Sequence, residues 1–239
     1  MGEKSFDKII GILFPRRCPV CGEIVMPKGN MICPSCKKKV KLVKEPRCKK
    51  CGKCLVSEET EYCYDCIRKK HSYETGISLF EYDEVMKQSI YGFKYKNKRE
   101  YADYYIEELM NNYKKQILDW KAEVLIPVPL HKSRYLYRGF NQAEVLAKKI
   151  GKDLDLPVDV DLLIRKKKTV AQKGLNHKER EKNLQDAFHI IEKVVQYKKV
   201  ILIDDIYTTG STIEACTKVL KIKGVKEVYF LSLCIGRDY

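Results

Sequence analysis

The chain has 239 residues and a formal net charge of +15, from 47 Lys and Arg against 32 Asp and Glu. This length allows one α/β domain with a full hydrophobic core together with a smaller module. All apolar runs are shorter than the about 20 residues that span a bilayer, which excludes a transmembrane helix. The charge is uneven: residues 1–70 hold 17 basic and 8 acidic side chains, so the first third differs in kind from the rest.

The N-terminal stretch MGEKSFDKIIGILFPRR contains Phe6, Ile9, Ile10 and Leu13 at helical spacing. This predicts a short helix that packs on the protein itself, and a helix on a membrane surface is the alternative. Acids among the lysines, a glycine inside the apolar run and the lack of a small-residue cleavage site make it a poor signal peptide. We therefore expect a cytoplasmic, reducing setting, in which clustered cysteines bind metal rather than form disulfides.

A duplicated cysteine frame follows. Nine of the 11 cysteines lie between Cys18 and Cys66, and the first four recur 30 positions later, as Gly22 does at Gly52. Two CxxC pairs separated by 11 residues complete the tetrahedral four-sulfur site that Zn²⁺ prefers. The repeat therefore predicts two structural zinc sites with these ligands: Cys18, Cys21, Cys33 and Cys36 in one, and Cys48, Cys51, Cys63 and Cys66 in the other.

Cys54 lies outside this repeat, because its counterpart 30 positions earlier is Ile24. The run CKKCGKC contains two overlapping CxxC pairs, and the repeat favours Cys48 and Cys51 as ligands. An iron–sulfur cluster is an alternative, because four thiolates serve either metal. Four thiolates on Zn²⁺ leave a local charge of about −2, which the neighbouring lysines offset. The positive charge of these lysines therefore argues only weakly for nucleic-acid binding.

The polar stretch RKKHSYETG, residues 68–76, predicts a boundary between a zinc module over 1–70 and a second domain over 71–239. Strands and helices alternate after it, which predicts an α/β fold with a parallel sheet. Gly151 is expected to close its helix. The expected elements are helices over 85–95 and 101–118, a buried strand over 123–127, a helix over 141–151, a buried strand over 200–203, a helix over 211–223 and a strand over 227–234.

The stretch VILIDDIYTTGST carries the clearest functional signal. Ligands of open parallel sheets bind beyond the carboxyl ends of the strands, and Asp204 and Asp205 are expected to leave a strand at such an end. Residues 207–210 would form a loop before a helix that begins at Ser211, whose free N–H groups and dipole suit a phosphate. The loop needs an anion and the acids need hydroxyls or a cation, so a ribose phosphate satisfies both. A capped helix start without a ligand is the alternative.

This stretch resembles the PRPP-binding signature of type I phosphoribosyltransferases, and the whole chain resembles the ComF family of competence-related proteins. The resemblance includes the cysteine module, FKYKNKREYA from Phe93, IPVPLHKSRYLYRGFNQA from Ile126 and TVAQKGLNHKEREKNLQDAF from Thr169. It implies a type I phosphoribosyltransferase-like fold, a parallel sheet flanked by helices, with an N-terminal zinc module. It also implies a link to DNA uptake or processing. Tyr207 departs from the aliphatic residue usual in the signature, although a side chain that points toward the hood over the site could be of either kind.

By position, the resemblance implies that Asp204 and Asp205 are catalytic residues that hold the ribose hydroxyls. Mg²⁺ is implied as the ion between ribose and pyrophosphate oxygens. The basic residues Arg134 and Arg138 follow the implied pyrophosphate loop and suit a diphosphate, while a basic surface loop is the alternative. The implied PRPP-binding residues are Asp204, Asp205, Tyr207, Thr208, Thr209, Gly210, Ser211 and Thr212. The implied pyrophosphate loop is Val128, Pro129, Leu130, His131 and Lys132.

Residues 165–183 begin with five cations in nine positions and have no clear apolar period, which predicts a loop that closes over the ligand. One interpretation is an enzyme that transfers phosphoribose from PRPP to an unknown acceptor. The alternative is a non-catalytic accessory protein that senses PRPP or a nucleotide, binds single-stranded DNA and works with other competence proteins. The DNA patch expected in that case comprises Phe93, Lys94, Tyr95, Lys96, Lys98 and Arg99.

Overall fold

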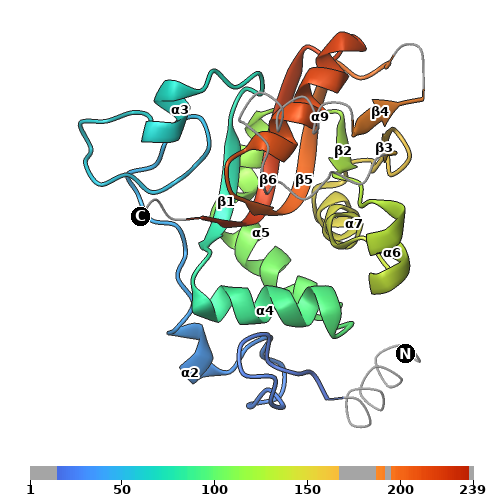
Figure 1. Ribbon diagram of the computed structural model, residues 1–239. Coiled ribbons are helices and arrows are strands. Elements are labelled where there is room, and N and C mark those ends of the chain that lie inside the picture. Colours follow the sequence, from blue (N-terminus) through green and yellow to red (C-terminus); the bar gives the residue numbers. More distant parts are fainter. Residues whose placement is uncertain (1–14, 167–186, 192–194, 237–239) are drawn as a thin grey trace, which may run out of the picture.

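A four-stranded parallel sheet lies at the centre of the computed structural model, which describes residues 15–166, 187–191 and 195–236 (Figure 1). The strands are arranged in the order β1-β6-β5-β2. The expected parallel sheet is confirmed, but β1 is absent from the predicted elements, because it begins at the last residue of the polar stretch that predicts a boundary. The strands are β1 (Gly76–Glu81), β2 (Val124–Pro127), β5 (Lys199–Tyr207) and β6 (Glu227–Ile235).

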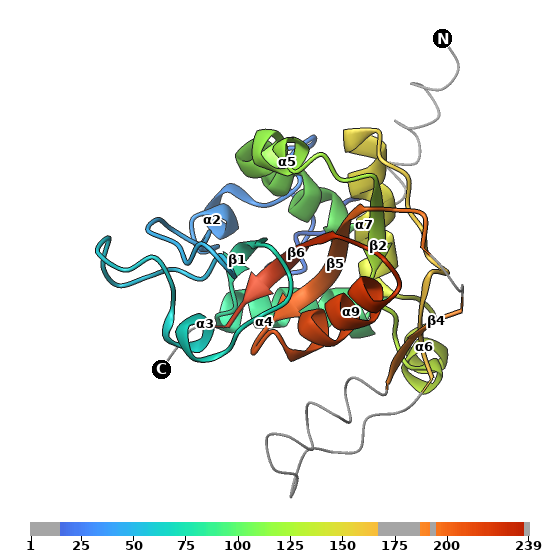
Figure 2. The same ribbon diagram turned by 90° about the horizontal axis from the view of Figure 1, so that it is seen from above.

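Helices cover both faces of this sheet, and Figure 2 shows α5 and α9 on opposite sides of it. Alternate residues of a strand point to opposite faces. Ile201 and Ile203 accordingly pack in one core cluster with residues of α4, α5 and α7, whereas Val200 and Leu202 pack in the other with residues of α9. The longer helices are α4 (Glu84–Tyr95), α5 (Tyr101–Asp119), α7 (Gln142–Leu154) and α9 (Ser211–Ile222).

The cysteine-rich segment forms two small ribbons, and each packs in a different one of the two core clusters. Cys18 and Cys36 of the first ribbon belong to the core cluster of α4, α5 and α7. Cys48, Cys51 and Cys63 of the second ribbon belong to the cluster that contains α9. Each ribbon carries one short helix, α2 (Pro34–Lys37) in the first and α3 (Tyr64–Arg68) in the second.

Helix α7 was expected to end at Gly151. It continues for three more residues, to Leu154. Asp155 ends it in the left-handed conformation, with φ 54°, and donates its N–H to the carbonyl of Gly151. A Cβ at Gly151 would lie 2.7 Å from the carbonyl oxygen of Leu156. Glycine is therefore needed here for close packing and not for a turn.

Strand β5 is also longer than expected and includes the acid pair. Ile206 and Tyr207 still pair with Cys234 and Ile235 of β6, because β6 runs beside them to its own end. The loop before α9 is therefore only residues 208–210. Asp204 and Asp205 lie inside the last part of the strand, which directs their side chains toward opposite faces of the sheet.

A short antiparallel pair, β3 (Leu163–Arg165) and β4 (Phe188–Ile190), lies outside the central sheet. The helix predicted near the N-terminus falls in residues 1–14, and most of the predicted closing loop falls in 167–186. Both predictions lie outside the described residues. Among the helices that the structure describes, none is long and apolar enough to cross a membrane.

Candidate functional site

The two sets of four cysteines expected from the repeat come together in the structure. Within each set the four sulfur atoms lie within 4.8 Å of one another. The Sγ atoms of Cys21 and Cys33 are 3.9 Å apart, and those of Cys51 and Cys63 are 3.6 Å apart. Four sulfurs that surround a zinc ion at about 2.3 Å are separated by about 3.8 Å. The donor sets therefore fit structural Zn²⁺.

The turns at these sites repeat as the sequence does. Gly22 and Gly52 have φ values of 78° and 74°, which glycine adopts without strain. Each donates its N–H to the backbone carbonyl of the first cysteine of its turn, Cys18 or Cys48, at 2.9 Å. Cys54 lies outside the second set, is exposed, and donates its thiol to the carbonyl of Leu55.

We expect elemental analysis of protein purified without chelators to give two Zn²⁺ per chain. The variant Cys51→Ser should lose one ion, because three thiolates no longer close a tetrahedral site. The control Cys54→Ser should keep both ions. Iron with visible absorbance, or loss of an ion only in Cys54→Ser, would contradict this assignment.

The adjacent carboxylates of β5 meet different partners. Asp205 accepts a hydrogen bond at 2.8 Å from Nζ of Lys94, in the last turn of α4, and both side chains are mostly buried. Asp204 accepts the backbone N–H of Asp205 at 2.8 Å. For Asp205, the cation that the acid pair is expected to need is therefore supplied by the chain itself. Lys94, expected to contact DNA, neutralises it.

Asp204 faces a cavity at the carboxyl end of β5. Arg134 and Arg165 supply cations to its wall. The cavity thus combines one half-buried carboxylate, two guanidinium groups and a loop rich in hydroxyls, which is a donor set for a phosphorylated polyol. The remaining lining residues are Ile206, Tyr207, Thr208, Thr209, Gly210, Ser211, Thr212 and Ile213.

The loop that lines this cavity leads directly into α9. Gly210 takes the N-cap position with φ 73°, and within the described residues no side chain caps the helix start. The hydroxyls of Thr209 and Ser211 are hydrogen-bonded to each other at 2.8 Å. Uncapped N–H groups at a helix N-terminus, beside hydroxyl donors, form an arrangement that suits a phosphate.

Tyr207 points into the protein and not toward a hood over the site. Its ring is buried beneath the loop and stacks on Phe230, with ring centroids 4.8 Å apart and an interplanar angle of 7°. Its hydroxyl is hydrogen-bonded to that of Tyr73 at 2.7 Å. A Cβ at Gly210 would lie 2.3 Å from the Tyr207 hydroxyl, so glycine is required here mainly by the ring below it.

The pKa of Asp204 is raised to about 7, first by burial and then by the charge of Asp205, although the Asp205 N–H opposes the shift. An aspartate in an unfolded chain has a pKa of about 3.9. The native state therefore binds more protons between these values, and stability falls as the pH rises through this window.

We expect the free energy of unfolding of the ligand-free protein to be lower at pH 8 than at pH 5.5, by about 2 kcal/mol. Asp204→Asn should remove most of this difference, because the amide keeps the acceptor but carries no charge. Urea denaturation at both pH values measures it. The same pH dependence in both proteins would show that another group is responsible.

The expected pyrophosphate loop follows β2, the strand next to β5. The N–H of Val128 donates to the carbonyl of Ile203 at 2.9 Å, and Asn141 Nδ2 donates to the Val128 carbonyl at 3.1 Å. His131 ends the loop, because its ring nitrogen accepts the N–H of Ser133 and so caps helix α6, Lys132–Arg138.

The cations of α6 are used differently from one another. Lys132 belongs to the helix and not to the loop, and Arg134 reaches the cavity. Arg138, also expected at the diphosphate, instead donates to Gln142 Oε1 at 2.8 Å and to the Tyr95 hydroxyl at 2.7 Å.

The expected DNA patch is only partly on the surface. Phe93 is fully buried in the core, so it offers no face to a base, and Lys94 is bound to Asp205. Arg99 lies over the ring of Phe140 at 4.4 Å. Tyr95 is exposed and accepts the hydrogen bond of Arg138.

Comparisons with known proteins agree with this architecture. The double zinc ribbon domain family matches residues 9–67, and the phosphoribosyl transferase domain family matches residues 106–238. Competence protein F of Haemophilus influenzae is 32% identical over 90% of this chain and 95% of that protein. The chain belongs to the ComF family.

Other relatives of this ComF-family chain carry related descriptions. Competence protein ComFC of Streptococcus pneumoniae is 30% identical over 91% of this chain and 99% of that protein. DNA utilization protein YhgH of Shigella flexneri is 27% identical over 72% of this chain and 77% of that protein. The phosphoribosyltransferase fold and the family predicted from the sequence are thereby confirmed, and the zinc ribbon family supports structural zinc.

Proposed function

We propose that this protein binds PRPP with Mg²⁺ in the cavity at the end of β5 and transfers the phosphoribosyl group to an acceptor, in the cytoplasm, during DNA uptake or processing. We also propose a division of the chain near residue 70 into a zinc module and a phosphoribosyltransferase domain. One observation carries the proposal. A half-buried carboxylate, two arginines and an uncapped helix start with a hydroxyl-rich loop line the same cavity.

Most parts of PRPP have a matching group in the cavity. The ribose hydroxyls would donate to Asp204, which lines the cavity, and to Asp205, which would give up its bond to Lys94 to reach them. Residues 208–212 would hold the 5′-phosphate at the start of α9. Arg134 and Arg165, with the loop after β2, would bind the diphosphate. Bound with PRPP, Mg²⁺ would neutralise charge on the departing diphosphate.

In the reaction, the acceptor forms a bond to C1 of the ribose while the bond from C1 to the pyrophosphate oxygen breaks and its electron pair leaves with pyrophosphate. Positive charge develops on the ribose ring as this bond lengthens. The carboxylates of Asp204 and Asp205 would stabilise that charge and orient the ribose. The basic wall formed by Arg134 would stabilise the negative leaving group.

Release of pyrophosphate separates an enzyme from a sensor. An acceptor screen of nitrogenous bases and nucleosides, with PRPP and Mg²⁺, should give acceptor-dependent release in the wild type and none in Asp204→Asn. Saturable PRPP binding without release from any acceptor would support the non-catalytic alternative.

A second function, binding of single-stranded DNA, is favoured by a strip of exposed tyrosines beside the site. Tyr91 and Tyr95 of α4 have ring centroids 5.0 Å apart, and Tyr95 and Tyr137 of α6 are 6.2 Å apart. The Arg138 guanidinium lies 4.7 Å from the Tyr95 ring centroid, and Lys96 lies 6.0 Å from that of Tyr91. Alternating aromatic faces and cations suit unstacked bases and their phosphates.

We expect Tyr91→Ala with Tyr137→Ala to weaken binding of an oligothymidine at least about tenfold, because stacking contributes about 1–3 kcal/mol per base. Affinity should also fall with salt, by about 0.7 log units per log unit of salt for each phosphate contacted. Fluorescence anisotropy at several salt concentrations measures both. Tyr64→Ala, an equally exposed tyrosine beside Arg68 in the second ribbon, is the control. An equal loss in the control would remove the strip from consideration.

A further inference from the structure

The second zinc ribbon lies on the side of the sheet that holds the candidate ligand loop, and the first does not. The first ribbon is attached to α5, through the ion pair of Lys37 with Glu108 at 2.9 Å and of Arg16 with Asp103 at 2.9 Å. The second is attached to β1, where the N–H of Gly76 donates to the carbonyl of Lys50 at 3.0 Å.

The second ribbon is also pressed closely against this strand. A Cβ at Gly52, which follows the CxxC turn, would lie 2.8 Å from the carbonyl oxygen of Gly76. Thr75 donates its hydroxyl to the carbonyl of Lys49 at 2.7 Å. The position of the turn that holds Cys48 and Cys51 is therefore coupled to the chain just before β1.

That same piece of chain supports the ligand loop from below. Tyr73 is fully buried, and its hydroxyl bonds to Tyr207 directly under Gly210. Its ring also meets Phe230 edge to face, with centroids 5.1 Å apart, so that Phe230 contacts both tyrosines. The two tyrosine hydroxyls are the polar link between this chain and the floor of the loop.

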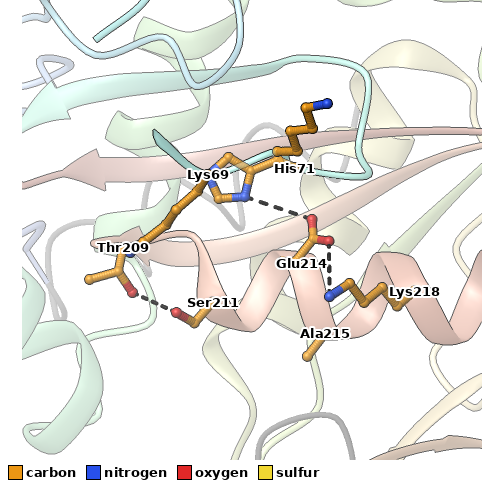
Figure 3. Close-up of a pocket in the computed structure, with 8 residues that line it drawn as sticks. Lys69, His71, Thr209, Ser211, Glu214, Ala215 and Lys218 are labelled. Carbon is orange, nitrogen blue, oxygen red and sulfur yellow. Dashed lines mark hydrogen bonds and ion pairs between the residues drawn. The ribbon is translucent and has the colours of Figure 1, made fainter. Parts of the chain in front are cut away.

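A second link holds the first turn of α9. The backbone N–H and the hydroxyl of Ser72 each donate to one carboxylate oxygen of Glu214, both at 2.7 Å. The Nδ1 atom of His71 lies 3.7 Å from the same carboxylate. Figure 3 shows His71 and Glu214 at a small cavity that Thr209 and Ser211 also line. Residues 71–73 thus contact both the helix start and the ring beneath the loop.

We propose that the second zinc ribbon positions the ligand loop, residues 208–212, through Tyr73 and Ser72, so that zinc in this ribbon, and not in the first, sets the affinity for the phosphorylated ligand. Tyr73 is a positioning residue in this arrangement, because it acts on the ligand through Tyr207. Without the second zinc, the segment that follows Cys66 loses its anchor and the loop samples other conformations. The consequence for PRPP rests on the function proposed above, whereas the consequence for the loop does not.

The internal repeat offers a matched pair of variants. Cys63→Ser and Cys33→Ser change equivalent ligands, and each should lose one zinc ion. Hydrogen–deuterium exchange of the full chain without ligand should show amides 208–212 exchanging at least tenfold faster in Cys63→Ser and at the wild-type rate in Cys33→Ser. Equal exchange of the loop in the two variants would overturn the proposal.

Tyr73→Phe tests the same link with both zinc sites intact. It keeps the ring and removes only the hydroxyl, so loop exchange should rise about threefold or more, and zinc content should stay at the wild-type value. If the loop is unaffected, Tyr73 is not a positioning residue. Titration with PRPP and Mg²⁺ is then compared across all variants. Failure of the wild type itself to bind would refute the proposed function, while the exchange rates would still decide the role of the ribbon.

Discussion

The double variant Asp204→Asn, Asp205→Asn is expected to lose most of the rise in melting temperature that PRPP with Mg²⁺ gives the wild type. Ribose hydroxyls that donate to carboxylates form charge-assisted hydrogen bonds, each contributing about 1.5–3 kcal/mol. Loss of two such bonds lowers affinity by about 100-fold or more, and the ligand-induced stabilisation falls with it by mass action. Thermal melts with and without ligand measure the effect.

The ligand-free double variant should stay folded, because two changes oppose each other. Lys94 loses its ion pair with Asp205, whereas the charge of Asp204, which burial and the charge of Asp205 disfavour, disappears. Asp119→Asn, an exposed acid at the end of α5, is the control and should keep the full response to PRPP. If the double variant responds to PRPP as the wild type does, the acid pair does not bind the ribose.

The second large effect is expected at the glycine of the loop. Gly210→Ala places a Cβ where the Tyr207 hydroxyl now lies, 2.3 Å away, and also strains a backbone with φ 73°. The ring has to move and break its bond to Tyr73. We expect a loss of about 3 kcal/mol or more, which lowers the melting temperature by about 6–12 °C for a chain of this size.

Gly139→Ala separates the two causes. Gly139 has nearly the same φ, 77°, but the structure shows nothing within 4 Å of its Cβ among the described residues. This control should therefore cost only the backbone strain, about 1–2 kcal/mol. In a Tyr207→Leu background, Gly210→Ala should become about as mild as the control. Equal effects of both glycine variants in the wild-type background would contradict the contact with Tyr207.

Most of the sequence-based predictions that the structure confirms rest on patterns within short stretches of the chain. The 30-residue cysteine repeat predicted which sulfurs gather, because it favoured Cys48 and Cys51 over the overlapping pair that includes Cys54. The buried run before Asp204 and the helical period after Ser211 predicted strand, loop and helix correctly in type. The predicted end of a strand was wrong where pairing with another strand extends it. Strand β5 continues past its predicted end because β6 pairs with its last residues.

What the sequence did not predict are contacts between distant residues. Lys94 and Asp205 are 111 positions apart, and in the sequence Lys94 is one lysine of a basic run. The polar stretch over 68–76 predicts a boundary, because polarity is the usual mark of a linker. Tyr73 within it is nevertheless fully buried, since Tyr207, 134 positions away, satisfies its hydroxyl.

Calorimetric titration of the zinc-loaded wild type with PRPP in the presence of Mg²⁺ tests the central claim most directly. We expect saturable binding of one PRPP per chain, tighter than about 1 mM, a value that corresponds to only about 4 kcal/mol of binding free energy. The same titration of Asp204→Asn, Asp205→Asn should give no saturable heat. A wild type that fails to bind PRPP, or a double variant that binds it equally well, would contradict the assignment of a ribose-phosphate site to the end of β5.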